Sequence, residues 1–492
     1  MSADTRQRLA PDAARAGVGD VALFLQGAWR EGGGGRLEVI DPSTERAVGS
    51  VSLADDRDLD SALAAAEHAF PDWAATPAHE RGAVLRRASE LVSERLPVIA
   101  GLLSLEGGKV PGEAAAEVAR AAETLRWSGE EAGRIEGRAI AGRTVGSTRT
   151  SLPVPVGVVA AFSAWNFPAF LASRKLAAAL AAGCSVVYKP AEETPGTAAE
   201  IVRAIADAGA PPGVVNLVFG DPPRVSERLI TAPPVQAVTF TGSTAVGRIV
   251  AQLAARGPKR CVLELGGHAP VIVCEDGEVE LAVNATLGAK FGSAGQSCVA
   301  PSRFLIHASR YAEFAERFAA AAASLRVASP DEHGAQMGPV ISPKRLSAMQ
   351  RLVDDALAAG GRVLCGGQRM ARGGYFWAPT VLADVPADAE IMREEPFGPL
   401  APLSSFTELD EAIDRANRTG YCFAGYLFTD SLSTRARALA RLQVTNLGIN
   451  QSAPSMPDVP LGGMGASGYG YEGGRDGIHA FQHLRLVSES VA

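Results

Sequence analysis

The chain has 492 residues, with 47 basic and 54 acidic side chains and a formal net charge of −7. A chain of this length is expected to form at least two domains and to bury roughly three quarters of the surface that the unfolded chain exposes. Because the charges are spread without runs of one sign, the composition argues against a nucleic-acid-binding surface and against an anionic-membrane surface.

The amino-terminal residues 1–20 lack the apolar core of a secretory signal, and we interpret them as a flexible tail. No stretch approaches the roughly 20 apolar residues of a membrane helix. The six cysteines lie far apart without a C-x-x-C motif, and the seven histidines are scattered. This pattern favours reduced thiols, predicts no metal site and is typical of a soluble cytoplasmic protein.

The next segment, to about residue 138, is predicted to be rich in helix. A short strand is expected at 23–25, followed by helices over 58–70 and 79–95, where apolar residues recur at helical spacing. The Glu-Gly-Gly-Lys run at 106–109 marks the end of a further helix.

From residue 156 onward, strands and helices alternate in the order that builds a parallel sheet. The expected strands are 156–162, 185–188, 214–218 and 236–240, and the expected helices are 170–182, 197–208, 224–230 and 245–255. This order predicts an α/β fold with a Rossmann-like domain, which binds its ligand at the carboxyl ends of the strands.

One strand-to-helix loop is a candidate phosphate-binding site. The run Phe-Thr-Gly-Ser-Thr-Ala-Val-Gly at 240–247 offers backbone N–H groups and the Ser243 hydroxyl, with Gly242 and Gly247 beside it. An ordinary helix N-cap is the alternative. The run at 468–473 fits G-x-G-x-x-G letter for letter, but no βαβ unit follows it, so we interpret it as a turn-rich connection.

Three polar side chains carry the candidate chemistry. Cys298 follows Gly-Ser-Ala-Gly-Gln-Ser, whose small residues indicate a tight loop and an accessible thiol nucleophile, although a lone cysteine is more often a small buried hydrophobe. Glu264 lies between an apolar run and two glycines, where a carboxyl pKa rises and the group can act as a general base. Asn166 follows the strand 156–162, and its amide can donate a hydrogen bond to an oxyanion.

At these three stretches the sequence resembles the aldehyde dehydrogenase superfamily, and the resemblance runs over nearly the whole chain. It implies that Cys298 is the nucleophile, that Glu264 is the base for deacylation, and that Asn166 and the Cys298 N–H form the oxyanion hole. An aldehyde would then be oxidised to an acid through a thiohemiacetal and a thioester.

The same resemblance implies an NAD cofactor, with NADP possible. The cofactor residues that it implies are Trp165, Lys189, Glu192, Gly242, Ser243, Gly247, Leu265, Glu395 and Phe397. A carboxylate at Glu192 would hold ribose hydroxyls and repel a 2′-phosphate, whereas Lys189 keeps NADP possible. For Glu193, a solvated charged turn is the expected environment. Glu472 matches a carboxylate that moves protons in some relatives.

The resemblance also predicts the domains. The dinucleotide-binding domain is expected at 21–138 and 158–265, the catalytic domain at 266–450, a connecting segment at 451–475, and a small β oligomerisation arm at 139–157 and 476–492. Such an arm pairs with a neighbouring subunit, so a homodimer or homotetramer is expected. Sequence alone does not require this, since any edge strand can pair.

The substrate residues are predicted to be Phe170, Arg174 and Ser455. Arg174 lies eight residues after Asn166 in an otherwise apolar helix, and a buried guanidinium needs an anion. The pattern is similar to succinate-semialdehyde and 2-oxoglutarate-semialdehyde dehydrogenases, although Gly292 stands where those enzymes commonly carry a second arginine. We expect a semialdehyde with a distal carboxylate. The alternatives are another polar, aromatic or aliphatic aldehyde, acyl transfer to coenzyme A, and a catalytically silent scaffold of the same fold.

Overall fold

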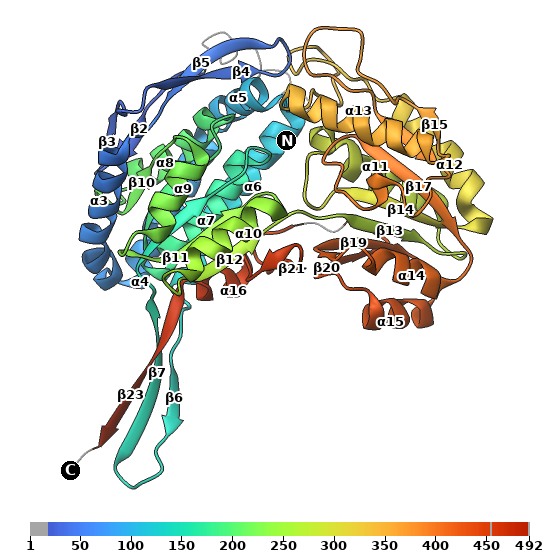
Figure 1. Ribbon diagram of the computed structural model, residues 1–492. Helices are drawn as coiled ribbons and strands as arrows, with labels where there is room; N and C mark the ends of the chain where they lie inside the picture. The colour runs from blue at the N-terminus through green and yellow to red at the C-terminus, as the bar shows by residue number, and fades with distance from the viewer. Residues whose placement is uncertain (1–17, 453–454, 491–492) are drawn as a thin grey trace.

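A computed structural model describes residues 18–452 and 455–490 (Figure 1). Two α/β units lie beside each other, and a narrow β-arm projects from the first unit (Figure 1). Each unit encloses its own buried apolar core. The first core takes most of its side chains from residues 21–265, and the second from residues 269–438.

The first unit is built on an eight-stranded sheet with the strand order β22-β12-β11-β8-β9-β10-β2-β3. Strands β8 to β12 run parallel to one another, whereas β22 and β2 pair antiparallel at either side of them. The strands are β2 (Leu23–Leu25), β3 (Ala28–Arg30), β8 (Val158–Phe162), β9 (Ser185–Lys189), β10 (Val215–Leu217), β11 (Val235–Thr241), β12 (Arg260–Glu264) and β22 (Gly468–Tyr469).

Two groups of helices pack on this sheet. Helices α3, α9 and α10 form one group, and α7 and α8 form the other, with α4, α5 and α6 packed outside them. The alternation predicted from residue 156 is confirmed, with ends shifted by no more than two residues. The helices are α3 (Asp56–Ala75), α4 (Ala78–Glu94), α5 (Leu96–Gly107), α6 (Pro111–Ala132), α7 (Pro168–Ala182), α8 (Pro195–Asp207), α9 (Pro222–Thr231), α10 (Thr244–Ala255) and α16 (Gly474–His479).

The second unit repeats the α/β pattern on a seven-stranded sheet with the order β15-β16-β17-β14-β13-β19-β20. Only β15, at its edge, pairs antiparallel in this sheet. Its strands are β13 (Ala269–Val273), β14 (Pro301–His307), β15 (Arg362–Cys365), β16 (Thr380–Ala383), β17 (Leu400–Phe406), β19 (Ala424–Phe428) and β20 (Asn446–Ile449). Its helices are α11 (Val279–Phe291), α12 (Ala308–Ala323), α13 (Pro343–Ala358), α14 (Leu409–Asn417), α15 (Leu432–Arg441) and the short η1 (Gly292–Gly295) and η2 (Glu390–Met392).

The projecting arm is a three-stranded sheet made from two distant parts of the sequence (Figure 1). Strand β7 (Ser147–Pro155) lies in the middle, with β6 (Arg138–Ala141) on one side and β23 (Gln482–Ser490) on the other, all antiparallel. A two-stranded sheet also joins β18 (Tyr421–Cys422) to β21 (Met464–Gly465).

Three sequence interpretations need correction. The run at 468–473 is more than a turn-rich connection, because its first two residues form β22 at the edge of the first sheet. Gly468 allows this: its φ is +104°, and an added Cβ would lie 1.9 Å from the Leu263 carbonyl oxygen. Residues 476–479, which were placed in the arm, belong to helix α16.

The third correction concerns the predicted tail at 1–20. Residues 1–17 lie outside the described residues, but residues 19–20 are not a tail. They belong to β1 (Gly19–Val21), which pairs parallel with β5 (Arg46–Ser52), and β5 pairs with β4 (Arg36–Asp41). Backbone hydrogen bonding to a neighbouring strand orders them, which their polar composition does not indicate.

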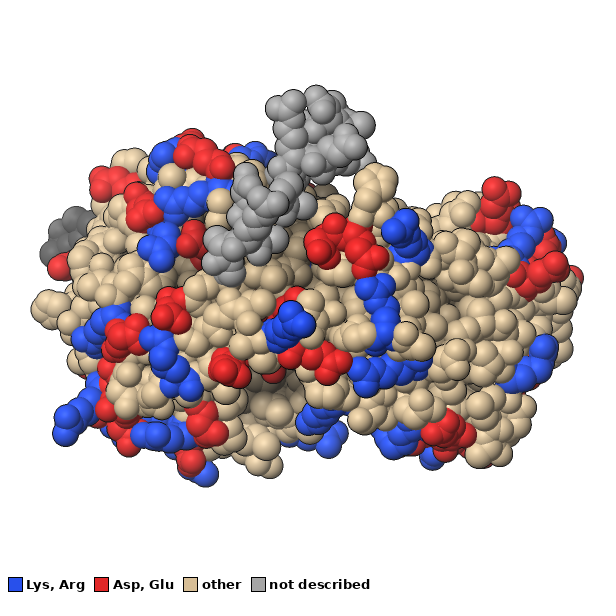
Figure 2. Space-filling view, turned by 90° about the horizontal axis from the view of Figure 1, so that it is seen from above, with Lys and Arg blue, Asp and Glu red and all other residues tan. Residues whose placement is uncertain are grey.

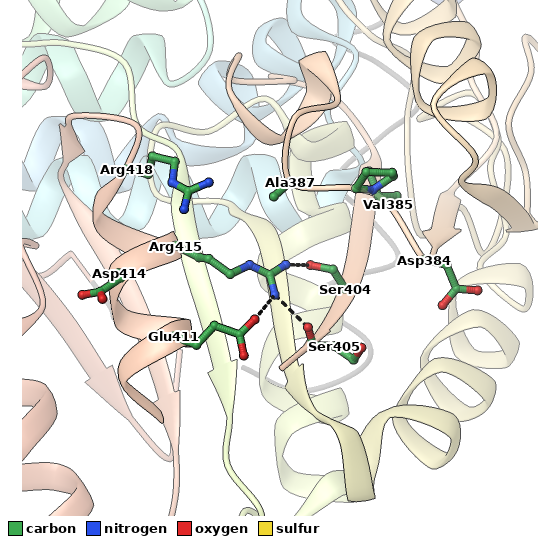
Figure 3. Close-up of a pocket in the computed structure, with 10 residues that line it drawn as sticks. Asp384, Val385, Ala387, Ser404, Ser405, Glu411, Asp414, Arg415 and Arg418 are labelled. Atoms are coloured by element: carbon green, nitrogen blue, oxygen red, sulfur yellow. Dashed lines mark hydrogen bonds and ion pairs between the residues drawn. The ribbon is translucent and has the colours of Figure 1, made fainter. Parts of the chain in front are cut away.

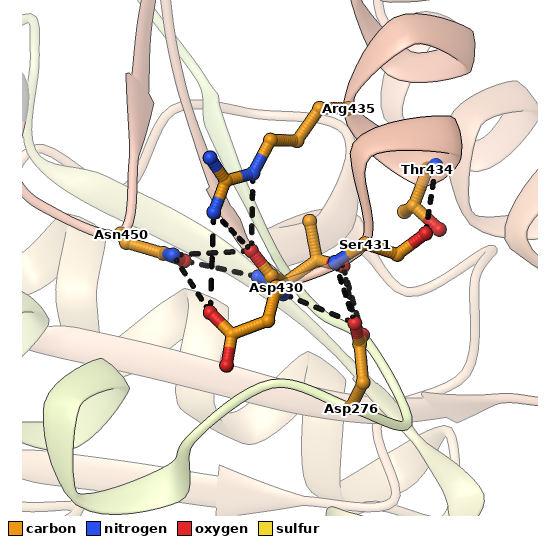
Figure 4. Close-up of polar contacts among 7 residues, drawn as sticks. Asp276, Asp430, Ser431, Thr434, Arg435 and Asn450 are labelled. Atoms are coloured by element: carbon orange, nitrogen blue, oxygen red, sulfur yellow. Dashed lines mark hydrogen bonds and ion pairs between the residues drawn. The ribbon is translucent and has the colours of Figure 1, made fainter.

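A polar network fixes the carboxyl ends of β19 and β20 (Figure 4). The Asp276 carboxylate accepts hydrogen bonds from the Thr429 hydroxyl at 2.8 Å and from the N–H of Ser431 at 2.8 Å. Asn450 has a φ of +55°, and its side chain accepts a hydrogen bond from Thr429 N and donates one to Thr429 O, both at 3.0 Å. Asparagine tolerates this left-handed geometry, so the chain can turn here toward the segment that carries Ser455.

The surface carries both charge signs side by side. On the face seen in Figure 2, Lys and Arg side chains are interspersed with Asp and Glu over both units. Across residues 18–452 and 455–490, no helix is long and apolar enough to cross a membrane. All six cysteines carry free thiols.

Candidate active site

A cavity of about 650 Å³ lies between the two units and brings together most of the predicted site residues. Both units contribute to its wall, and the loops that follow the carboxyl ends of β8, β11 and β12 face it, as expected for an open α/β sheet. The predicted residues that line it are Trp165, Asn166, Phe170, Arg174, Gly242, Ser243, Glu264, Leu265, Cys298, Glu395, Phe397 and Ser455. Lys189, Glu192 and Gly247 do not line it.

A second hollow of about 710 Å³ lies beside β17 and α14 (Figure 3). Arg415, a charged group in this hollow, already has partners within the protein: it donates hydrogen bonds to the Ser405 carbonyl at 2.7 Å and to Glu411 at 3.2 Å. None of its lining residues was singled out in the sequence. We therefore place the candidate active site in the cavity around Cys298.

The loop before Cys298 is held in a left-handed conformation. Ser293 and Ala294 have φ values of +49° and +53°, which non-glycine residues seldom adopt. The Glu113 carboxylate on α6 accepts the Ser293 N–H at 3.1 Å with both oxygens. The Gln296 amide bridges the Ser293 carbonyl and the Ile341 N–H, both at 3.0 Å. These contacts outweigh the local backbone preference and fix the position of the thiol.

The substitution Glu113→Ala tests this clamp. Ser293 N–H loses its acceptor, so we expect about 1–3 kcal/mol less stability and roughly tenfold lower turnover as the thiol shifts. Thermal unfolding and the rate of thiol alkylation by iodoacetamide measure the two effects. Glu123→Ala on the same helix is the matched control, since Glu123 forms an ion pair only with Arg126 among the residues that the structure describes. If the two variants behave alike, Glu113 does not position the loop.

Cys298 and Glu264 are in direct contact. The Cys298 thiol donates to Glu264 Oε1 at 3.4 Å, and the Thr241 hydroxyl donates to Oε2 at 3.2 Å. Burial raises the pKa of Glu264 to about 6, and the negative charge of Glu472 adds to the shift. Burial also raises the pKa of Cys298 well above its usual range, and the charge of Glu264 adds to it. The resting pair is therefore a thiol beside a carboxylate that can accept its proton.

Gly267 lets the loop that carries Cys298 approach the loop that follows β12. A Cβ on Gly267 would lie 2.0 Å from the Cys298 carbonyl oxygen, so any side chain there would push the cysteine loop away from the end of β12. Gly267 is thus needed for the close approach of the two backbone segments.

Asn166 lies against the same loop. Its Nδ2 donates to the Gln296 carbonyl at 3.0 Å, which leaves its second N–H for another acceptor. Helix α7 starts two residues later and takes its N-terminal cap from a distant helix: Glu117 on α6 accepts the N–H groups of Ala169 at 3.0 Å and Phe170 at 3.3 Å. Lys109 forms a buried ion pair with Glu117, so the start of α7 is firmly positioned.

Arg174 is almost fully buried at the wall of the cavity, with 2% of its surface exposed. It donates to the Ser455 hydroxyl at 2.6 Å and to the Glu472 carbonyl at 3.1 Å, while its Nε has no partner in the described part of the chain. Its guanidinium carbon lies 5.0 Å from the centre of the Phe170 ring. The three predicted substrate residues are thus neighbours.

The residues predicted to contact the cofactor fall into two groups. Ser243 is the N-cap of α10 and is exposed at the cavity beside Gly242, as is Glu193. Glu192 instead lies behind the wall, where it accepts from Lys189 at 2.7 Å and from Gly220 N–H at 3.0 Å. Gly247 is also behind the wall. A Cβ on it would lie 2.2 Å from Leu265, so it serves close packing.

Glu395 and Phe397 line the part of the cavity wall that comes from the second unit. Glu395 accepts the Gly267 N–H at 3.1 Å, and burial raises its pKa to about 8. Phe397 adopts a φ of +40° and packs edge-on against Trp165, with ring centres 5.5 Å apart. These two aromatic rings face the same cavity as the Cys298 loop.

Glu472 is buried, and it is close enough to Glu264 for its charge to affect that carboxyl. It forms a buried ion pair with Lys175 and accepts from the Thr239 hydroxyl at 3.1 Å. Burial opposes its ionisation, but the charges of Lys175 and Arg174 lower its pKa below the usual range, so it is a carboxylate. Its charge in turn raises the pKa of Glu264.

Comparison with known proteins identifies the family of this chain. The model of the aldehyde dehydrogenase family matches residues 29–487. This chain belongs to the aldehyde dehydrogenase family. It is 47% identical over 466 residues to the 4-(hydroxymethyl)benzenesulfonate dehydrogenase TsaD1 of Comamonas testosteroni, with 94% of this chain and 97% of the relative covered.

Two further relatives bear on substrate and cofactor. The enzyme is 38% identical to the succinate-semialdehyde dehydrogenase (NADP(+)) GabD of Escherichia coli strain K12, with 94% of this chain and 96% of the relative covered. The crystal structure of PnpE in complex with nicotinamide adenine dinucleotide superposes with a TM-score of 0.93 at 35% identity and covers 96% of this chain and 98% of that one. The aldehyde dehydrogenase fold expected from the sequence is confirmed.

Sequence reasoning missed the contribution of helix α6. Glu113, Glu117 and Arg120 all reach the site or its supports, yet the segment was expected only to be an outer, helix-rich part of the molecule. Their spacing of four and three residues places them on one helix face, which was the available signal. Only the tertiary structure shows that this face meets the cysteine loop.

Proposed function

We propose that this aldehyde dehydrogenase oxidises an aldehyde with a distal anionic group, most simply the carboxylate of a semialdehyde, to the corresponding acid. The observation that carries the proposal is the environment of Arg174. Its buried guanidinium contacts a hydroxyl and a carbonyl, and no carboxylate of the described residues forms an ion pair with it. A buried cation that forms no ion pair among the described residues is suited to an anion on the substrate.

Two of the relatives support this proposal by their names. One is named for a sulfonate and one for a semialdehyde, and a sulfonate and a carboxylate are both anions at a distance from the reacting carbon. Oxidation of an uncharged aldehyde is the alternative, and the apolar Phe170 ring beside Arg174 favours an aromatic or extended substrate within either class.

The contacts of Cys298, Glu264 and Asn166 support a mechanism with a covalent intermediate. The carboxylate of Glu264 takes the proton of the Cys298 thiol, which then adds to the aldehyde carbon. The free N–H of Asn166 and the Cys298 N–H stabilise the oxyanion. A nicotinamide dinucleotide, when bound, supplies the hydride acceptor. The thioester left on Cys298 is hydrolysed by water that Glu264 deprotonates, so the same carboxylate serves both steps.

The residues present fit a nicotinamide dinucleotide. Glu395 is a buried carboxylate with one backbone donor and room for ribose hydroxyls, and the N-terminus of α10 with Ser243 can bind a pyrophosphate. We propose NAD as the preferred form, because the exposed carboxylate of Glu193 lies at the cavity just beyond the end of β9, where it would repel a 2′-phosphate. Lys189 is committed to Glu192 in this arrangement, which further disfavours NADP.

We further propose that the domain bounds expected from the sequence hold apart from the corrected residues 19–20 and 476–479, that the arm mediates a homodimer or homotetramer, and that the enzyme is cytoplasmic. The arm exposes large apolar side chains, among them Leu484 at 68% and Leu486 at 63%. Exposed apolar strands of this kind favour pairing with another chain. The mass in solution, measured by light scattering, decides between a dimer and a tetramer.

The substitution Arg174→Leu tests the proposed substrate class. We expect kcat/KM for succinate semialdehyde to fall by about 2–5 kcal/mol in transition-state binding, because the carboxylate is left buried and unpaired. Hexanal should lose little. Equal losses for both aldehydes would mean that Arg174 has a structural role, and a wild-type preference for hexanal would contradict the anionic substrate.

A further inference from the structure

One face of helix α6 points at the active-site cavity. Glu113, Glu117 and Arg120 follow each other at spacings of four and three residues and therefore share a face. The first holds the cysteine loop through Ser293 N–H, and the second caps helix α7. Arg120 is the next in this row, and its side chain lines the cavity together with Phe170, Arg174 and Ser455.

Arg120 differs from Arg126 of the same helix, and from Arg134 just beyond its end, in forming no ion pair with the described residues. Arg126 pairs with Glu130 at 3.0 Å, and Arg134 pairs with Glu131 at 3.2 Å. The half-buried Arg120 guanidinium makes no ion pair or side-chain hydrogen bond with any residue of 18–452 or 455–490. On the same helix face, the Glu117 carboxylate already forms an ion pair with Lys109 and accepts the N–H of Ala169 at the start of α7.

The two cavity arginines approach the same aromatic ring. The guanidinium carbon of Arg120 lies 5.4 Å from the centre of the Phe170 ring, and that of Arg174 lies 5.0 Å from it. Burial lowers the pKa of Arg174, and the positive charge of Arg120 lowers it further. Two like charges about one ring repel each other, and an anion bound between them would relieve that repulsion.

The two arginines differ in depth. Arg174 is buried and close enough to the reacting groups to sense the charges of Glu264 and Cys298, whereas Arg120 is half-buried on α6. A short aliphatic substrate whose anion contacts Arg174 need not extend to Arg120. A larger substrate, with an aromatic ring beside Phe170 and an anion on the far side of that ring, brings its oxygens within reach of both guanidinium groups.

We propose that Arg120 is a specificity-determining residue that binds the distal anion of the substrate together with Arg174, and that the substrates which use both are aromatic aldehydes with a sulfonate or carboxylate opposite the aldehyde. This inference rests on the proposed function and extends it by naming the substrate class. The two guanidinium groups supply donors from two directions, which suits the three oxygens of a sulfonate as well as the two of a carboxylate.

The experiment compares Arg120→Gln with Arg126→Gln, which removes the same charge from the same helix away from the cavity. The substrates are 4-sulfobenzaldehyde, 4-carboxybenzaldehyde, benzaldehyde and succinate semialdehyde. In Arg120→Gln we expect KM for the two anionic aromatic aldehydes to rise about tenfold or more, with kcat changed less than about twofold. Benzaldehyde and succinate semialdehyde should change less than about threefold, Arg126→Gln should match the wild type, and Arg120→Lys should recover part of the loss.

A second measurement does not depend on turnover. The product analogue 4-sulfobenzoate should protect Cys298 from alkylation in the wild type, and Arg120→Gln should need about tenfold more of it for the same protection. The relative losses for the sulfonate and the carboxylate show which anion Arg120 binds better.

Three results would overturn the inference. If Arg120→Gln lowers kcat/KM for benzaldehyde as much as for the anionic aldehydes, Arg120 is structural. If it changes none of them while Arg174→Leu abolishes the preference for anions, Arg120 is a solvated charge and the proposed function stands without it. If the wild type shows no preference for anionic aldehydes over benzaldehyde, the proposed substrate class itself is wrong.

Discussion

Cys298→Ala is expected to lower aldehyde oxidation to below roughly one part in 10⁴ of the wild-type rate, because the covalent step is lost while the rest of the site remains. Alanine fits the loop, because neither the approach of the Cys298 carbonyl to Gly267 nor the hydrogen bond from Asn166 to the Gln296 carbonyl involves the thiol. Absorbance of the reduced cofactor measures the rate, and quenching of protein fluorescence measures cofactor binding, which should be unchanged.

Cys365→Ala is the matched control. Cys365 is a free, half-buried thiol on β15, at the far edge of the second sheet. Its removal should leave turnover within about twofold of the wild type, since surface and edge substitutions seldom change stability by much. If Cys298→Ala retains turnover, this cysteine is not the nucleophile.

Glu264→Gln is expected to slow steady-state turnover by about 10²–10⁴-fold, because an amide cannot deprotonate the water that hydrolyses the thioester. Thr241 can still hydrogen-bond the glutamine, so the change is mainly chemical. Rapid mixing should show a burst of reduced cofactor close to one equivalent per site, followed by the slow phase. Because Glu264 also contacts the thiol, the burst should be slower than in the wild type and should accelerate as pH rises.

The pH dependence of the wild type follows from the same carboxyl. Burial raises the pKa of Glu264 to about 6, and only the ionised form accepts a proton. Turnover limited by deacylation should therefore be level above about pH 6 and should fall below it, by up to tenfold per pH unit. A burst that is absent at every pH in Glu264→Gln would mean that this carboxylate is indispensable for activating the thiol rather than mainly for hydrolysis.

Local patterns in the sequence predicted much of the first unit. The apolar runs that became β8, β9, β10 and β11 are buried over their full length, except at Gln236, and the intervening helices carry apolar residues at helical spacing. Such periodicity reflects burial directly, so a parallel sheet could be inferred without neighbours. The small residues around Cys298 likewise indicated a tight loop, which the left-handed Ser293 and Ala294 bear out.

Other features depended on contacts between segments far apart in the chain. Residues 19–20 form a strand because they pair with β5. Residues 468–469 extend the first sheet because Gly468 can approach β12. Lys189 and Gly247 have further contacts of this kind: Lys189 pairs with Glu192, and Leu265 packs where a Cβ on Gly247 would lie. Their predicted roles toward a cofactor stay predictions.

The sequence by itself therefore determined the α/β class and indicated the candidate thiol and the candidate carboxyl base, because these depend on residue type and local spacing. The tertiary structure alone decided which side chains converge on the cavity. Glu113 on helix α6 lies 180 residues before Ser293 in sequence, yet it holds the cysteine loop, and Arg120 of the same helix lines the same cavity as Arg174. Contacts of this kind arise from the packing of whole elements, and no local pattern records them.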